Sequence, residues 1–118
     1  LVDLAAAAQD ADGYLFTFNQ IHFPQTRWAN LQVEHELYCH GHLIEAGIAA
    51  ASLPRHAALF GVARRAADLL VRRFAAATPA ETPGHPEVEL ALLRLADVTG
   101  DERYAALAGM AREAGCGA

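Results

Sequence analysis

Apolar residues recur every three or four positions along most of the chain, which is the spacing of helices that bury one face. Local chemistry marks the helix ends, because Asn and Asp cap helix starts, Pro suits a first turn and Gly ends a helix. Asn30, Pro54, Pro86 and Asp101 stand at such starts, and Gly100 at an end. The pattern predicts helices over residues 1–9, 31–52, 55–77, 86–99 and 102–114.

One stretch departs from helical spacing. Between Tyr14 and Phe23 apolar and polar residues alternate at first, which favours extended backbone. The sequence offers no second strand to pair with this stretch, so we expect a short extended aromatic segment rather than a sheet. Its aromatic side chains are predicted to join the core.

The predicted elements form an all-α architecture of antiparallel helical hairpins, because short loops join successive helices and strands do not alternate with them. Residues 1–118 are treated as a single region. In the helix over 55–77, the apolar stripe predicts a core face and four arginines predict a solvated face. The stripe comprises Leu59, Val62, Ala63, Ala66, Leu70 and Phe74, and the arginines are Arg64, Arg65, Arg72 and Arg73.

Composition narrows the class of protein. Hydrophobic residues make up 53% of the chain, which is typical of a globular fold. The net charge is −5 and the nine basic residues are all Arg, which argues against a nucleic-acid surface. Apolar runs are too short for a membrane span, no leader is visible, and two distant cysteines favour a reduced, cytoplasmic protein. The chain does not begin with Met, which suggests a piece of a longer protein.

Candidate chemistry gathers in residues 34–42, where three His, one Cys and two Glu fall within nine positions. His35, Cys39 and His42 share one helical face at spacings of four and three residues, and we expect this polar face to line a cavity in the core. A zinc site here is disfavoured, because zinc usually takes four ligands and a single helix rarely supplies three. The zinc-protease pattern His-Glu-x-x-His fails too, because Cys39 stands at its last position.

Other polar residues leave two interpretations open. Glu36 and Glu45 could be pocket carboxylates, although such residues are more often solvated or paired with Arg. Trp28 could stack on a sugar face, or it could anchor its loop while Arg27 holds backbone carbonyls.

Six sequence blocks, in this order, resemble glycoside hydrolase family 127, the β-L-arabinofuranosidase-like group. They span nearly the whole chain, so the resemblance is more specific than any one block. The blocks are Asp12-Gly13-Tyr14-Leu15, Arg27-Trp28-Ala29-Asn30-Leu31, His35-Glu36-Leu37-Tyr38-Cys39, Gly41-His42-Leu43-Ile44-Glu45-Ala46, Gly84-His85-Pro86-Glu87-Val88-Glu89-Leu90-Ala91-Leu92 and Thr99-Gly100-Asp101-Glu102-Arg103-Tyr104.

The resemblance implies part of an (α/α)6 catalytic barrel in a retaining hydrolase that removes terminal β-L-arabinofuranosyl residues. It implies a cysteine nucleophile on zinc, with ligands downstream of the matched blocks, so we expect no catalytic residue and no metal ligand in this chain. His42 and His85 match positions that look like sugar-contacting histidines, and His35 is expected to line the same pocket. Cys39 and Cys116 match none of the metal-binding cysteines.

Two departures from the family pattern stand out. His40 occupies a position where a small residue is expected, and Ala29 replaces a residue with a hydroxyl group.

Rival interpretations remain. The chain could be a non-catalytic helical-hairpin interaction module, or part of another (α/α)-barrel sugar enzyme. Open barrel edges would expose apolar helix faces, which predicts self-association or binding to the remainder of the barrel. The other expected partner is the carbohydrate substrate that the family resemblance implies.

Overall fold

The computed structural model describes residues 2–22, 25, 27–28, 32–74 and 86–116, with the backbone alone for residues 18, 32–35, 86 and 110–116. Within these ranges the chain is helical and holds no strand, which confirms the all-α prediction. None of the described helices has the length and apolarity needed to cross a bilayer. The helices are α1 (Val2–Ala8), α2 (Thr17–His22), α3 (Gln32–Ala50), α4 (Ala58–Phe74), α5 (Pro86–Thr99) and α6 (Glu102–Cys116).

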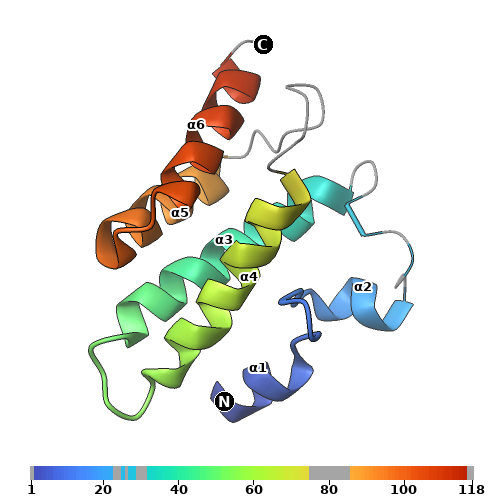
Figure 1. Ribbon diagram of the computed structural model, residues 1–118. Coiled ribbons are helices and arrows are strands. Elements are labelled where there is room, and N and C mark those ends of the chain that lie inside the picture. The colour runs from blue at the N-terminus through green and yellow to red at the C-terminus, as the bar shows by residue number, and fades with distance from the viewer. Residues whose placement is uncertain (1, 23–24, 26, 29–31, 75–85, 117–118) are drawn as a thin grey trace.

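Helix α3 is the centre of the arrangement (Figure 1). It packs against α4 on one side and against α5 on another, while α6 packs mainly on α5 and α1 on α4. The pairs α3–α4 and α5–α6 are the two predicted helical hairpins (Figure 1). Both pairs run antiparallel because short turns join their helices, at residues 51–57 and 100–101.

The core is formed by apolar side chains that all four long helices contribute. The predicted stripe of α4 faces this core, although Leu59 is only partly buried, and the four predicted arginines of α4 are exposed. The main cluster comprises Leu37, Ile44, Ala67, Leu70, Phe74, Val88, Ala91, Leu92, Leu95, Tyr104, Leu107 and Ala108.

The α5–α6 turn follows the predicted capping chemistry. Gly100 has φ +72°, a left-handed conformation that glycine adopts easily at a helix end. An Asp101 side-chain oxygen accepts the backbone N–H of Arg103 at 3.0 Å, as an N-cap residue does. The predicted helix boundaries at residues 86 and 99 are confirmed here.

The predicted extended segment is wrong beyond residue 16, because residues 17–22 form α2. Gln20 explains the difference. Its backbone N–H donates to the Phe16 carbonyl at 3.0 Å, and its side-chain oxygen accepts the Phe16 N–H at 3.1 Å. The first bond is an ordinary helical bond and the second resembles one half of a capping box, and together they favour a helix despite the alternating pattern.

The prediction that the face of His35, Cys39 and His42 enters the core is also wrong where side chains are described, because Cys39 and His42 are exposed. The buried face of α3 carries Glu36, Leu37 and His40 instead. Two glycines let neighbouring helices come close to this buried face. A Cβ at Gly41 would lie 2.9 Å from Glu87 Cγ, and one at Gly47 would lie 2.3 Å from Ala63 Cβ, so the neighbouring helices approach α3 at these positions.

Candidate functional site

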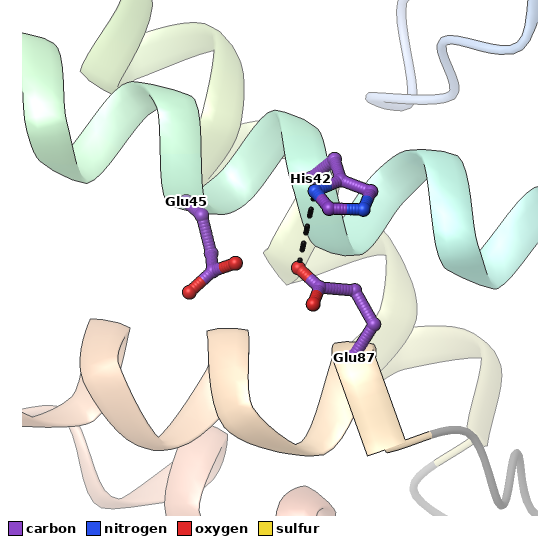
Figure 2. Close-up of side chains that lie close together, drawn as sticks. All are labelled: His42, Glu45 and Glu87. Carbon is purple, nitrogen blue, oxygen red and sulfur yellow. Dashed lines mark ion pairs between the residues drawn. The ribbon is translucent and has the colours of Figure 1, made fainter.

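His42 is the predicted site residue that the structure describes in full, and it lies between α3 and α5. Its side chain is 51% exposed, and its Nδ1 atom lies 3.4 Å from Glu87 Oε1 in the first turn of α5 (Figure 2). The Tyr38 ring packs edge-on against the imidazole, with centroids 4.4 Å apart. One side of the ring is thus held by protein groups, and the other is open.

Two carboxylates and a guanidinium extend this contact. Glu45, one turn after His42 on α3, reaches into the same space as Glu87 (Figure 2), and the ligand atoms of the three residues lie within 4.8 Å of one another. Arg94 Nη1 lies 2.5 Å from Glu45 Oε1. Burial raises the pKa of Glu87, and the hydrogen bond and negative charge of Glu45 raise it further. The two carboxylates therefore lie between the Arg94 guanidinium and the His42 imidazole.

This cluster suits hydroxyl recognition better than a zinc–thiolate centre. A neutral imidazole donates one hydrogen bond and accepts another, which matches a sugar hydroxyl. The cluster contains no cysteine, and Arg94 already neutralises Glu45, so these residues do not fit the zinc site that the resemblance implies.

A second, largely buried network lies on the opposite side of α3. The Tyr14 hydroxyl donates to Glu36 Oε2 at 2.5 Å, and the Trp28 backbone N–H donates to both Glu36 oxygens at 2.9 and 3.1 Å. Trp28 has φ +62°, which is rare for a bulky residue. Glu36 is thus one of the expected carboxylates, and it holds the preceding loop rather than lining an open pocket.

His40 belongs to this buried network. Its Nδ1 lies 2.7 Å from the Glu36 carbonyl, and its Nε2 accepts the Leu15 N–H at 3.0 Å, so Nδ1 carries the proton. Burial lowers the pKa of His40 to about 4. In the sequence, His40 stands out only as a departure from the family pattern. The four-residue spacing from Glu36 and to Ile44 was the available indication that it shares the core face.

With this geometry established, comparison with known proteins identifies the chain. A family model described as β-L-arabinofuranosidase, GH127 catalytic domain, matches residues 1–115. The chain belongs to glycoside hydrolase family 127. The resemblance predicted from the six sequence blocks is confirmed.

Two GH127 relatives show how much of the family domain is present. The non-reducing end β-L-arabinofuranosidase of Bifidobacterium longum subsp. longum is 40% identical over 115 residues, which cover 90% of this chain and 17% of that protein. The crystal structure of a GH127 β-L-arabinofuranosidase from Geobacillus stearothermophilus T6 matches 96% of this chain and 18% of that one, with 39% identity and a TM-score of 0.83. The chain therefore spans less than a fifth of these relatives and is a fragment of a GH127 barrel.

The other predicted site residues of this GH127 chain are only partly visible. His85 and the His35 side chain lie outside the described residues. Cys39 is exposed at the edge of an apolar pocket of about 430 Å³ lined mainly by α1 and residues 15–17, and the partial burial of its side chain raises the pKa of the thiol.

The anchoring interpretation of Trp28 is confirmed. Its ring packs against Tyr14, His40 and Phe74, with centroids 5.3 to 5.6 Å apart. Arg27 lies over the Tyr14 ring, and among the described residues it pairs with the carboxylates of Asp10 and Asp12.

Proposed function

We propose that the full-length protein is a retaining β-L-arabinofuranosidase that removes terminal β-L-arabinofuranosyl residues, and that this chain supplies part of its sugar pocket. The observation that carries the proposal is the match of nearly the whole chain, at about 40% identity, to two proteins named for this activity. The helical-hairpin scaffold alone would not call for His42 and its polar partners between α3 and α5.

His42 is the proposed sugar contact with the best structural support. Its Nδ1 faces Glu87, so its Nε2 is available to a sugar hydroxyl. His85 directly precedes α5 in the sequence, and His35 stands two helical turns before His42 on α3. We assign both to the same pocket because one sugar ring offers several hydroxyl groups.

The nucleophile and any zinc ligands are proposed to lie in other parts of the full-length protein. A retaining glycosidase needs a nucleophile and a general acid on opposite sides of the scissile bond. Zinc bound to cysteine would supply a thiolate at neutral pH. The cluster of His42, Glu45 and Glu87 does not fit that centre, and we assign these residues to substrate recognition alone.

The activity is tested with the full-length protein and a p-nitrophenyl β-L-arabinofuranoside, with the α-anomer as the control. We expect release of p-nitrophenol from the β-anomer only, and an NMR time course that shows the β-sugar before mutarotation. An α-sugar as the first product would contradict retention. No hydrolysis of the β-anomer would contradict the proposed activity.

The pocket assignment is tested by His42→Ala in the full-length protein. Loss of its hydrogen bonds to the sugar is expected to lower kcat/KM about a hundredfold. Because the side chain is half exposed, the melting temperature should change little. Unchanged kinetics would remove His42 from the pocket.

A further inference from the structure

The contact between His42 and Glu87 has an electrostatic setting that favours one form of the imidazole. Glu87 Oε1 approaches Nδ1 and not Nε2, and a carboxyl oxygen without a proton only accepts hydrogen bonds, so this contact selects the form with a proton on Nδ1. The distance of 3.4 Å is longer than an ordinary hydrogen bond, and such contacts often shorten when a substrate binds.

Three structural features hold Glu87 in this place. It stands in the first turn of α5, where the helix dipole favours a carboxylate. Gly41 lets this turn approach α3, because a Cβ there would lie 2.9 Å from Glu87 Cγ. Arg94 neutralises Glu45, which reduces the repulsion between the two carboxylates.

We propose that Glu87 is a positioning residue that holds His42 with its proton on Nδ1, so that Nε2 is presented to the substrate as a hydrogen-bond acceptor. The Glu45–Arg94 ion pair supports Glu87 in this role. This inference rests on the proposed function and makes that function more specific. It names the substrate group that His42 contacts, which is a hydroxyl that donates to Nε2.

The first test is a double-mutant cycle in the full-length protein, with the p-nitrophenyl β-L-arabinofuranoside as the probe. Glu87→Ala is expected to lower kcat/KM about tenfold in the wild-type background and to have no further effect in a His42→Ala background. Glu87→Gln, whose side-chain oxygen can still accept from Nδ1, should recover part of the loss. Glu89→Ala is the matched control, because Glu89 lies in the same first turn but outside the cluster.

An equal loss from Glu87→Ala in both backgrounds would overturn the proposal, because a merely structural residue acts independently of His42. An effect of Glu89→Ala as large as that of Glu87→Ala would also overturn it, since the helix dipole alone would then explain the result.

The second test needs no activity. In full-length protein with ¹⁵N-labelled histidine, the His42 resonances are assigned by their loss in His42→Gln. We expect the proton on Nδ1 in the wild type and in Glu87→Gln, and its redistribution in Glu87→Ala. A proton on Nε2 in the wild type would overturn the proposal. Absence of hydrolysis by the wild type would reject the proposed function, while this measurement would still decide whether Glu87 sets the form of His42.

Discussion

Two histidines two positions apart on α3 have opposite environments. His40 is fully buried, with both ring nitrogens in hydrogen bonds, whereas His42 is half exposed and has one nitrogen near a carboxylate. A shift of two positions turns a helical side chain by about 200°, which is enough to move it from the core to the surface. Residue type alone therefore does not distinguish a buried histidine from an exposed one.

The burial of His40 predicts a specific acid sensitivity of folding. Its pKa is about 4 in the folded state and near 6.5 in the unfolded chain. The unfolded chain therefore takes up a proton as the pH falls through 6.5, while the folded state does not. Between pH 7 and pH 5 this difference should remove about 2 kcal/mol from the free energy of unfolding, and the loss should level off below pH 4.

The measurement compares chemical denaturation of the full-length protein at pH 7 and pH 5 with that of two variants. His40→Gln should lose this part of the pH dependence, because glutamine does not titrate and its oxygen can still accept the Leu15 N–H. His56→Gln, at an exposed histidine in the α3–α4 turn, should keep it. The same slope in all three proteins would contradict the assignment to His40.

At the residue scale, the role of a side chain was predictable from the sequence where a single interaction decides that role. Asp101 was predicted as a cap, and anchoring was one of the two interpretations of Trp28, because each depends on local or strongly apolar chemistry. The partnership of His42 with Glu87 was not predicted, since it joins positions 45 residues apart. Helix packing alone brings them together.

At the scale of elements, the spacing between α3 and its neighbours depends on glycine. Gly47 faces α4 so closely that an added methyl group would overlap Ala63 and press on the Leu59 carbonyl. Gly61 lies on α4 with no atom within 4 Å of an added Cβ. Position 47 should therefore resist substitution by alanine, and position 61 should tolerate it.

We expect Gly47→Ala to destabilise the protein by about 2 kcal/mol, because overpacking outweighs the better helix propensity of alanine. Gly61→Ala should be neutral or stabilise by up to about 1 kcal/mol. Denaturation of the two full-length variants beside the wild type checks both values. Stabilisation by Gly47→Ala would show that α4 does not approach α3 so closely.

The elements themselves were largely predictable from spacing and caps. Helix α5 was predicted with both boundaries, because Pro86 and Gly100 act through local backbone chemistry. The buried face of α3 was not predicted, because the buried Glu36 and His40 are polar, whereas the exposed Cys39 is uncharged. Only tertiary hydrogen bonds show that these polar groups can be buried.

At the scale of the whole molecule, α5 presents apolar side chains to solvent. Leu90 and Leu93 are each 43% exposed and Val98 is 56% exposed. In a fragment that spans less than a fifth of its relatives, such a face is suited to cover by further helices of the barrel.

The 118-residue chain prepared alone is therefore expected to self-associate and to show no hydrolysis of the β-L-arabinofuranoside. Light scattering over a range of concentrations measures the first property, and the p-nitrophenol assay the second. Leu90→Glu together with Leu93→Glu should reduce the association, whereas Glu102→Gln on exposed α6 surface should not. A monodisperse monomer would contradict this prediction, and turnover by the fragment would place the nucleophile within it.

Trp28 gives the chain a built-in optical reporter, because it is the single tryptophan in the sequence. Its indole meets Tyr14 before α2, His40 on α3 and Phe74 at the end of α4. Its emission in this chain thus depends on contacts with three segments that are far apart in sequence. The wavelength of that emission therefore reports, without any added dye, whether these three segments have packed around the indole.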